Sequence, residues 1–543
     1  MAWNYGDVLD RVADVVPQDK ACLVHGDRVI TWADFTRRTN NLAACFLQHG
    51  GQTGDKVAFY MRNSPAYSET LGACFKARLT HVNVNFRYVD DELWYILDNS
   101  DATIVVYDAQ FAGHVKALRA RLPEVTLWVE VCGEQAPEAE FSSSYETLAE
   151  QGEGAPLNIQ RRGDDMLFLY TGGTTGMPKG VMWTHDDHWH AVGGGAAIAP
   201  DLQPAADMAA HLQNVANAAS GGITIPCCPL MHGTGLFTGI STLARGGTVV
   251  TLESHGFDPR ELWQTVERHR VNALAIVGDA FAKPMLRELD EHPGQYDISS
   301  LQGIVSSGVM WSPEVKAGLL KHNANMVLTD SFGASEAVGF GRSVTTAQGT
   351  MQVARFELGE SCKVFTEDFR EVQPGSDEAG FVAKSGPIPL GYYKDEEKTA
   401  KTFPEINGVR YSIPGDFCKV AADGTLILMG RGSVCINTAG EKVYPEEVEE
   451  VLKTYPGVVD ALVVGLPDEK WGQMVTAVVQ PDGKQDLDEA AIQAHARKHL
   501  AGYKTPKRVL VKTDLGRASN GKADYKAITE YARSILTAGT AAH

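Results

Sequence analysis

A run of glycine and threonine, closed by a lysine, follows directly on an apolar stretch of this 543-residue chain. Residues 166–170 (MLFLY) are typical of a buried strand, and residues 171–180 read TGGTTGMPKG. Glycine lets backbone amides turn toward an anion, threonine adds neutral donors, and lysine supplies a charge that can follow a departing phosphate. The run therefore predicts a phosphate-binding loop, and a flexible surface loop is the less specific alternative. The candidate ligands are Thr171, Gly172, Gly173, Thr174, Thr175 and Lys179.

The loop differs from the one used by common nucleotide-hydrolysing proteins. That loop reads GxxxxGK followed by Ser or Thr, whereas Lys179 here lies between Pro178 and Gly180. The sequence therefore indicates a different nucleotide chemistry.

The elements that must position this loop alternate between two types. Short apolar runs at 57–60, 103–107, 247–250 and 274–277 are separated by helix-length amphipathic segments. This alternation predicts an α/β fold with mainly parallel sheets. The length of the chain favours two or more domains.

Toward the C-terminus the pattern changes. Short strands and turns become frequent from about Phe381, which predicts a β-rich subdomain over about 340–432. Beyond it we expect a helix at 446–452, strands at 458–464 and 474–479, and a helix from Asp488. We place a domain boundary near Gly432 and Ser433, so that residues 1–432 form an N-terminal domain and residues 433–543 a C-terminal domain.

The composition excludes several classes of protein. The 49 basic and 68 acidic residues give a net charge of −19, which repels nucleic acid and anionic lipid. The nine cysteines show no CxxC spacing, which fits a reduced cytoplasm. The acidic N-terminal segment does not resemble a signal peptide, and no run approaches the roughly 18 apolar residues of a membrane helix. We expect a cytoplasmic protein with no integral membrane segment and no nucleic-acid partner.

Residues 170–180 resemble the signature loop of the adenylate-forming superfamily, which includes acyl-CoA synthetases, adenylation domains of peptide synthetases and beetle luciferases. Each further motif is weak alone, but together they follow the superfamily in register over nearly the whole chain. They are 229–233 (PLMHG), 330–336 (DSFGASE), 411–416 (YSIPGD), 430–433 (GRGS), 440–445 (GEKVYP) and 519–522 (SNGK). The resemblance implies a large N-terminal domain of two doubly wound sheets plus a β-rich subdomain, and a small mobile α+β C-terminal domain. It also implies ATP, Mg²⁺ and coenzyme A.

The resemblance assigns roles around the nucleotide. Glu336 holds Mg²⁺ on the ATP phosphates, because a hard carboxylate suits that ion, and Ser335 bonds a phosphate oxygen. Phe332 replaces the usual tyrosine, so ring stacking on adenine survives while a phenolic hydrogen bond is lost. Asp416 accepts the ribose hydroxyls, and Arg431 braces the sugar or the α-phosphate, with an ordinary ion pair as its alternative. Further nucleotide-binding positions are Asp330, Ser331, Gly333 and an adenine wall of Ser307, Gly308 and Val309.

The resemblance also names the groups that touch the reacting atoms. Lys522 is the adenylation lysine, bridging the substrate carboxylate and the α-phosphate, and Thr171 is placed with it as a catalytic residue. His232 lies beside the reacting carboxylate, and a buried histidine bonded to backbone is the alternative.

A thiol must later reach the same carbonyl, so the resemblance implies rotation of the C-terminal domain about a pivot at 431–433. Gly440 then lines the pantetheine tunnel, flanked by Glu441 and Lys442.

Three functions are compatible with these motifs. The leading interpretation is an AMP-forming acyl-CoA synthetase, and residues 306–312 and 430–438 resemble actinobacterial-type fatty-acid and steroid-side-chain enzymes, so a fatty or bulky apolar acid is expected. A carrier-protein-loading adenylation domain is less compatible, because the segment around His232 offers no aspartate for an amino-acid ammonium and no carrier domain follows Lys522. A nucleotide-sensing scaffold would be expected to lose Lys179, Glu336 or Lys522, and all three are present. The sequence carries no signal for oligomeric state, and a homodimer is the working expectation.

Overall fold

The structure is a computed structural model that describes residues 2–88, 90–171, 177–194, 204–217, 221–309, 311–350, 355–359, 361–431, 436–438, 441–468, 472–484, 486–500, 502–517 and 523–540. The chain groups into two compact units. The first unit comprises 1–173, 177–351 and 385–412, and the second comprises 174–176, 352–384 and 413–543.

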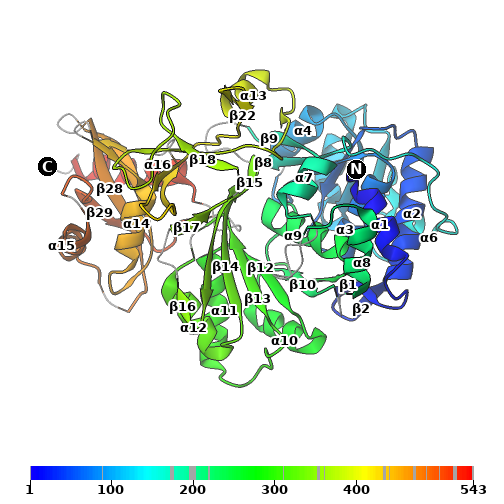
Figure 1. Cartoon of the computed structure of the whole chain (residues 1–543), viewed down its shortest axis with the longest axis horizontal. Helices are drawn as coiled ribbons and strands as arrows, with labels where there is room; N and C mark the ends of the chain where they lie inside the picture. Colours follow the sequence, from blue (N-terminus) through cyan, green and yellow to red (C-terminus); the bar gives the residue numbers. More distant parts are fainter. Residues whose placement is uncertain are drawn as a thin grey trace. The chain divides into compact units, whose positions relative to one another are not determined.

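The first unit contains two sheets built mostly from parallel strands (Figure 1). In the first sheet, the run from β14 to β1 is parallel, while β15 and β2 add antiparallel strands at its two sides. Its order is β15 (Ala337–Thr346), β14 (Val327–Ala334), β13 (Gly303–Ser307), β12 (Ala273–Ile276), β10 (Ile223–Pro226), β11 (Thr248–Thr251), β1 (Ala21–His25) and β2 (Arg28–Thr31), with β16 (Gly349–Thr350) beside β15.

The second sheet is parallel from β8 to β7 and continues through antiparallel β9 and β20. Its order is β20 (Gly391–Tyr392), β9 (Lys179–Thr184), β8 (Met166–Thr171), β4 (Thr80–Asn83), β3 (Lys56–Tyr60), β5 (Ala102–Asp108), β6 (Leu127–Val131) and β7 (Ser143–Ser144). A short hairpin of β21 (Glu405–Ile406) and β22 (Val409–Arg410) completes the strands of this unit.

Alternate residues of each strand enter different hydrophobic clusters, as the two-residue period of a strand requires. In β3, Val57 and Phe59 face the cluster between the two sheets, while Ala58 and Tyr60 face the opposite side. In β11, Val249 and Val250 likewise separate into two clusters. The sheets therefore lie in a five-layer arrangement of helices, sheet, helices, sheet and helices, which confirms the predicted α/β class.

The helices occupy three of these layers. Those between the sheets are α1 (Tyr5–Ala13), α2 (Trp32–Gln48), α3 (Pro65–Lys76), α6 (Tyr145–Glu150), α7 (His185–Ala191), α8 (Met208–Asn217) and α9 (Gly233–Ala244). Helices α10 (Pro259–His269), α11 (Asp279–Glu291) and α12 (Pro313–His322) cover the first sheet, and α4 (Asp90–Asn99) and α5 (Ala112–Leu118) cover the second. The short α13 (Glu396–Thr402) follows β20.

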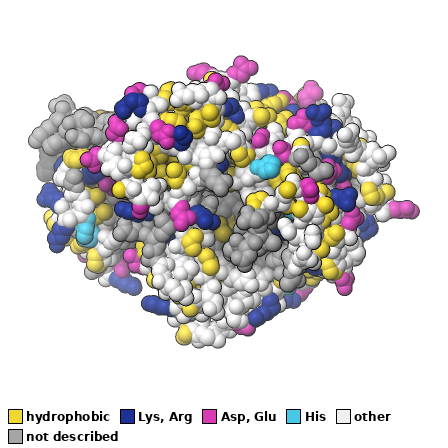
Figure 2. Space-filling view, in the orientation of Figure 1, with side chains coloured by type: hydrophobic (Ala, Val, Ile, Leu, Met, Phe, Trp, Pro, Cys, Tyr) yellow, Lys and Arg dark blue, Asp and Glu magenta, His cyan; other side chains and the backbone are white. Residues whose placement is uncertain are grey.

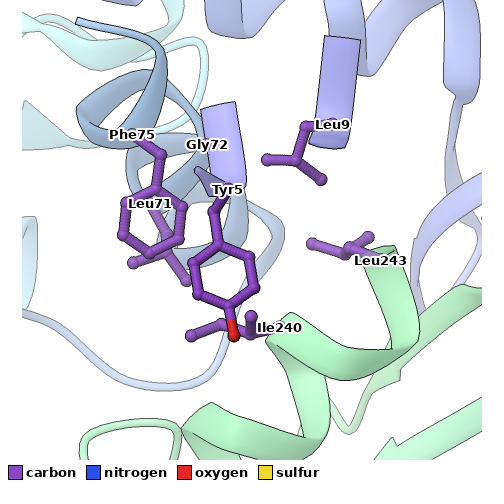
Figure 3. A pocket seen from close by; sticks show the side chains of 7 residues that line it. All are labelled: Tyr5, Leu9, Leu71, Gly72, Phe75, Ile240 and Leu243. Carbon is purple, nitrogen blue, oxygen red and sulfur yellow. The ribbon is translucent and has the colours of Figure 1, made fainter. Parts of the chain in front are cut away.

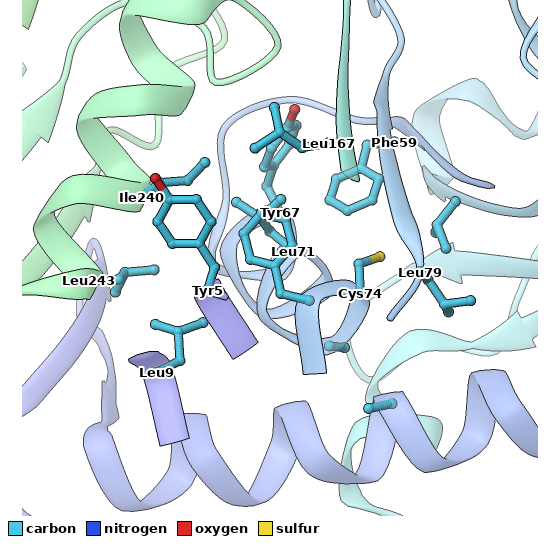
Figure 4. Packing of buried hydrophobic residues seen from close by; sticks show 14 of the residues in the cluster. Tyr5, Leu9, Phe59, Tyr67, Leu71, Cys74, Leu79, Leu167, Ile240 and Leu243 are labelled. Atoms are coloured by element: carbon cyan, nitrogen blue, oxygen red, sulfur yellow. The ribbon is translucent and has the colours of Figure 1, made fainter. Parts of the chain in front are cut away.

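The layer between the sheets is closely packed. Leucine, isoleucine and aromatic side chains of α1, α3 and α9 meet one another there and continue to Phe59 and Leu167 of the second sheet (Figure 4). They enclose a cavity of only about 10 Å³, lined by side chains that include Tyr5, Leu71 and Ile240 (Figure 3). A space of this size holds about one water molecule, so this cavity cannot receive a substrate.

The same layer also contains buried charges. Arg38 of α2 donates two hydrogen bonds to the carboxylate of Glu69 on α3, at 2.6 and 3.0 Å. Tyr145 of α6 donates to the same carboxylate at 2.9 Å. The side chains of Arg38 and Glu69 are 4% and 0% exposed, so they fix three helices together without access to solvent.

The second unit contains two smaller sheets. One is antiparallel, in the order β18 (Cys362–Phe365), β19 (Ala379–Lys384), β23 (Asp416–Val420), β24 (Leu426–Arg431) and β17 (Arg355–Leu358). The other has the order β26 (Glu441–Val443), β25 (Ile436–Thr438), β28 (Gly472–Pro481) and β27 (Val458–Asp468), with β29 (Arg508–Val511) beside β28. Helices α14 (Pro445–Lys453) and α15 (Glu489–His499) cover one face of this second sheet, and α16 (Tyr525–Thr540) covers the other.

The predicted strands and helices of the C-terminal region are present, with β27 extending four residues beyond the expected end at 464. The proposed domain boundary at Gly432 and Ser433 lies outside the described residues and stays a prediction.

Candidate active site

The predicted phosphate loop joins two adjacent antiparallel strands of the second sheet. β8 ends at Thr171, β9 begins at Lys179, and these two residues face each other in the strand register. The hydroxyl of Tyr95 on α4 donates a hydrogen bond to the carbonyl of Pro178 at 3.1 Å. The base of the loop is therefore fixed from two sides, and Lys179 belongs to a strand. Gly172, Gly173, Thr174 and Thr175 lie outside the described residues.

A buried asparagine connects this loop to the first sheet. The side-chain amide of Asn83, at the end of β4, donates to the carbonyl of Tyr170 at 2.9 Å and to the carbonyl of Met231 at 2.7 Å. Its carbonyl oxygen accepts from the backbone N–H of Tyr170 at 2.6 Å. One side chain thus sets the end of β8 beside the residue that precedes His232.

His232 is the N-cap residue of α9, with an extended backbone. Its N–H donates to the carbonyl of Pro229 at 3.0 Å, and its carbonyl accepts from the N–H of Leu236 at 2.9 Å. Gly235 permits this turn, because a Cβ atom there would lie 2.5 Å from the carbonyl oxygen of Pro229. The imidazole is half-buried, which leaves both predicted interpretations of His232 open.

The hairpin between β14 and β15 carries Ser335 and Glu336 at its turn. The indole N–H of Trp183, in β9, donates to the carbonyl of Ser335 at 2.9 Å. The hydroxyl of Tyr392, in β20, donates to Oε1 of Glu336 at 2.7 Å, and the hydroxyl of Ser412 donates to the carbonyl of Glu336 at 2.7 Å. Within the described part of the chain, Oε2 of Glu336 has no hydrogen-bond partner. This half-buried carboxylate therefore keeps one oxygen for a ligand.

Lys179 forms an ion pair with Asp395, the N-cap residue of α13. The side chains are 34% and 20% exposed, so both charges remain within reach of solvent. The hydrogen bond from Lys179 lowers the pKa of Asp395 from its usual value, and the N–H of Lys398 adds to this effect.

Asp330 is held by a cation of the protein itself. Its carboxylate pairs with Lys316 of α12, whose ammonium also lies 5.4 Å from the ring centre of Trp311. Burial raises the pKa of Asp330, although the charge of Lys316 acts in the opposite direction. The two neighbours Ser331 and Phe332 follow in the same strand, and the buried ring of Phe332 packs against Phe340 at 5.3 Å.

The predicted adenine wall starts at the carboxyl end of β13. Ser307 ends this strand and faces Ser331 in the parallel register with β14. Gly308 follows with a φ of +91°, a left-handed conformation that favours glycine. Val309 packs against the cluster that covers the outer face of the first sheet. Sites in open α/β sheets lie outside the carboxyl ends of the strands, which is where Ser307, Gly333 and His232 are found.

The second unit brings two further predicted residues together. Asp416 begins β23 and faces Arg431, the last residue of β24, in the antiparallel register. Asp416 is 8% exposed. Lys442 lies in β26 opposite Asn437 of β25. The side chains of Arg431 and Lys442, and the whole of Gly440 and Lys522, lie outside the described residues.

The residues on either side of the Lys522 segment are anchored to the core of the second unit. The guanidinium of Arg517 donates to both oxygens of Asp460 in β27, at 2.5 and 2.9 Å. The hydroxyl of Tyr525 donates to Oε1 of Glu449 in α14 at 3.0 Å. Burial raises the pKa of Glu449 to about 8. The two ends of the segment are thus fixed to neighbouring elements of one small sheet.

The sequence model of the AMP-binding enzyme family matches residues 9–393, and the model of the AMP-binding enzyme C-terminal domain matches residues 447–522. The chain belongs to the AMP-binding enzyme family. Coenzyme A ligases of this family use ATP and coenzyme A.

Among relatives of this AMP-binding enzyme, a 3-oxocholest-4-en-26-oate–CoA ligase of Rhodococcus rhodochrous is 40% identical over 540 residues, covering 97% of this chain and 95% of the relative. A medium/long-chain-fatty-acid–CoA/3-oxocholest-4-en-26-oate–CoA ligase of Mycobacterium marinum is 40% identical over 538 residues, covering 97% and 96%. The solved anthranilate CoA ligase AuaEII, in complex with anthranoyl-AMP, superposes with a TM-score of 0.83 at 22% identity, covering 99% of this chain and 98% of that one, which supports the shared fold.

Several residues of the site were missed by the sequence reasoning. Asn83, Trp183, Tyr392 and Asp395 act through contacts with residues far away in the chain, and no motif quoted above contains them. The run of polar residues after the aromatic pair Tyr392 and Tyr393 is the one local signal that could have indicated the last two.

Two further observations concern the charges on the surface and the groups that could bind a metal. On the face shown in Figure 2, basic and acidic side chains of the described residues are interspersed. The described residues contain no group of three or more His, Cys, Asp or Glu that could hold a metal by themselves, so a carboxylate such as Glu336 would need further ligands from a nucleotide. None of the described helices combines the length and the apolar character that a membrane span requires.

Proposed function

We propose that this AMP-binding enzyme is an acyl-CoA synthetase that joins a carboxylic acid to coenzyme A at the expense of ATP. A carboxylate oxygen attacks the α-phosphorus, the bond between the α-phosphorus and the bridging oxygen to the β-phosphorus breaks, and pyrophosphate leaves. The thiolate of coenzyme A then attacks the acyl carbonyl of the adenylate and AMP leaves. The observation that carries the proposal is the segment 392–395, which contacts both Glu336 and Lys179, in a family whose relatives along the whole chain are CoA ligases.

The residues that hold the phosphates, the metal and the adenine serve the first half-reaction, and most of them belong to the first unit. Lys179 and the amides and hydroxyls at 171–175 neutralise the phosphates, and Ser335 adds a hydroxyl. Glu336 fits Mg²⁺, because it is a hard carboxylate with one oxygen already oriented by Tyr392 and the other available. When bound, Mg²⁺ draws negative charge from the phosphates. Ser307 to Val309 and Phe332 contribute the adenine site, with Asp330, Ser331 and Gly333 as the strand that supports it.

The residues of the second unit bind the ribose, bring a positive charge to the reacting groups and guide the thiol of coenzyme A. Asp416 and Arg431 hold the ribose, and Lys522 carries its ammonium to the point where the carboxylate meets the α-phosphate. Gly440 and Lys442 line the approach of the pantetheine arm after the C-terminal domain, beginning at residue 433, has rotated. In the first unit, His232 and Thr171 lie at the reacting carboxyl group.

The acid is proposed to be a fatty acid or a bulky apolar acid such as a steroid side-chain acid. Relatives that match nearly the whole chain are named as ligases for both classes. Helix α9, which begins directly after His232, presents mostly small and apolar residues. An adenylation enzyme that loads a carrier protein is the alternative, and it would form the adenylate without making the CoA thioester.

The described cysteines are all free thiols, and a cytoplasmic location is proposed on that ground together with the use of ATP. A homodimer is the proposed assembly, and light scattering at several protein concentrations tests it.

A half-reaction assay tests the proposed function. Pyrophosphate release is measured for a panel of fatty, aromatic and steroid side-chain acids, with and without coenzyme A, and thioester is followed separately. We expect release with apolar acids and thioester only with coenzyme A. Adenylate without thioester would favour carrier loading, and no release with any acid would contradict the proposal.

The Lys522→Ala variant provides a second test. It should slow adenylate formation by about a hundredfold or more, because an electrostatic partner of the transition state is lost. Thioester formation from a synthetic acyl-adenylate should stay near the wild-type rate. Full-speed adenylation in this variant would contradict the assigned role of Lys522.

A further inference from the structure

The segment from Tyr392 to Asp395 lies next to both charged groups of the ATP site in the first unit. β20 pairs with β9 through Tyr392 and Val181, and the N–H of Tyr393 donates to the carbonyl of Gly180 at 2.8 Å. The segment is therefore attached to the strand that begins with Lys179. Its position relative to the phosphate loop is set by backbone hydrogen bonds.

The first and last side chains of this segment point toward the site, and the two between them point away from it. Tyr392 donates to Glu336 at 2.7 Å, and Asp395 pairs with Lys179. Tyr393 and Lys394 between them both bond the carboxylate of Asp101, each at 2.6 Å. Two residues thus engage the site, and two anchor the segment to the surface.

The backbone turns at Lys394, which brings Asp395 back toward the site. Lys394 has a φ of +55°, in the left-handed region that residues other than glycine rarely adopt. After this turn, Asp395 accepts from the N–H of Lys398 at 2.9 Å and starts α13, while its other carboxylate oxygen is directed to Lys179. A non-glycine residue in this conformation persists where the surrounding contacts determine it.

We propose that residues 392–395 form a brace that presets the ATP site before the nucleotide binds. Tyr392 is a positioning residue that holds the carboxylate of Glu336 in one orientation, with its second oxygen directed to the metal. Asp395 is a stand-in anion that keeps Lys179 at the mouth of the loop until the triphosphate takes its place. This inference rests on the proposed function, because it assumes that the site takes a metal-bound nucleotide.

The two contacts have opposite consequences for binding. Loss of the Tyr392 hydroxyl lets the Glu336 carboxylate rotate, so affinity that depends on the metal should fall. Loss of the Asp395 charge removes an attraction that the triphosphate must replace, so affinity for ATP should rise. If Tyr392 and Asp395 only supported the fold, loss of either side chain would weaken ATP binding, with or without the metal.

Binding of ATP, measured by calorimetry in the absence of any acid substrate, tests the brace. For Tyr392→Phe we expect a three- to tenfold weaker affinity for ATP with Mg²⁺ and an unchanged affinity without it. Tyr393→Phe is the matched control, because it loses the same hydroxyl from the same segment but only toward Asp101. Thioester formation from a synthetic acyl-adenylate should be the same in both variants and the wild type. Equal affinities for Tyr392→Phe and wild type with Mg²⁺, or an equal loss with and without Mg²⁺, would overturn this part of the brace.

For Asp395→Asn we expect a three- to tenfold tighter affinity for ATP, with Asp101→Asn as the control that removes an equal charge from the outer side. A double-mutant cycle with Lys179→Met separates the ion pair from a general charge effect, because the gain should vanish when Lys179 is absent. A gain that persists in the Lys179→Met background, or a weaker affinity for Asp395→Asn, would overturn the stand-in role. Wild-type protein that binds no ATP at all would instead contradict the proposed function, so the two failures are distinguishable.

Discussion

Two groups of charged side chains in the first unit are built from the same chemical parts but differ in how they meet solvent. Arg38 and Glu69 are 4% and 0% exposed and their hydrogen bonds are made within the protein. Lys179 and Asp395 are 34% and 20% exposed, and Glu336 has one oxygen engaged by Tyr392. The first group holds helices together, because a buried charge must be fully paired. The second group remains available to a ligand.

Removal of Glu69 should have the largest effect on stability. Glu69→Gln replaces the fully buried carboxylate beside Arg38 with a neutral amide, although Arg38 keeps Glu146 and Glu150 on its outer side, and breaking a buried pair costs about 3–5 kcal/mol. We expect a lower urea midpoint for the first unfolding transition and an unchanged KM for ATP in the folded enzyme. Glu150→Gln is the control, since Glu150 also bonds Arg38 at 2.6 Å but its side chain is 51% exposed, and it should cost less than about 1 kcal/mol. Equal losses of unfolding free energy in the two variants would contradict the difference drawn between buried and exposed pairs.

Removal of Glu336 should have the opposite pattern. Glu336→Gln should lower the rate of adenylate formation by about 10²–10³-fold, because a charged ligand of the reacting phosphates is lost. The free energy of unfolding, measured with urea, should stay within about 0.5 kcal/mol of the wild-type value. Pre-steady-state pyrophosphate release and denaturant unfolding measure the two quantities. A strongly destabilised variant would indicate that Glu336 stabilises the fold, as Glu69 does.

Removal of Lys179 should have a smaller effect, and it should appear in nucleotide binding. A hydrogen bond to a charged group contributes about 1.5–3 kcal/mol, so Lys179→Met should raise the KM for ATP by about ten- to a hundredfold. Steady-state kinetics with ATP as the varied substrate checks this. Lys394→Met removes an equal charge from the outer side of the segment 392–395, where Lys394 pairs with Asp101, and should leave the KM within about twofold. An equal rise in both variants would indicate a general charge effect.

The last prediction concerns the pH dependence of stability at His185, a buried histidine that begins α7. Burial lowers the pKa of His185 to about 3. The unfolded chain, with a pKa near 6.5, takes up the proton first, so the stability that neutral His185 contributes is present above pH 6.5 and is lost as pH falls toward 3. Relative to His185→Asn, the wild type should lose about 1.4 kcal/mol per pH unit in this window.

Urea midpoints at pH 7, 6 and 5 measure this slope. The asparagine oxygen can accept the N–H of Tyr5, as Nδ1 of His185 does at 3.3 Å, so the variant keeps that contact. Parallel pH profiles for the two proteins would show that His185 titrates normally. Asp395 has a lowered pKa and stays ionised over the same range, so it adds no slope of its own.

The fold was predictable from local pattern to a large degree. Strands formed at the apolar runs 57–60, 103–107 and 274–277, because a short continuous apolar run is typical of a strand buried on both faces. The α/β class followed from the same signals.

The contacts that complete the candidate site were not predictable. Asn83 reaches Tyr170 and Met231 across 87 and 148 positions of the sequence, and Trp183 reaches Ser335 across 152. Such pairings depend on which strands become neighbours, and a single sequence does not specify that. For the same reason Asp330 was expected only at the nucleotide, whereas the structure adds Lys316 as its partner.

The three hydrogen bonds of Asn83 have a consequence for attempts to change the acid that this enzyme accepts. Exchange of the segment around α9 for that of another ligase would alter the proposed wall of the acyl site, yet the new segment must still offer a backbone carbonyl at position 231. That carbonyl accepts a hydrogen bond from the Asn83 amide, which also bonds the end of β8. A graft that shifts the carbonyl would therefore also shift β8 and the proposed nucleotide site that follows it. Chimeras that retain this junction should therefore change selectivity while keeping adenylate chemistry intact.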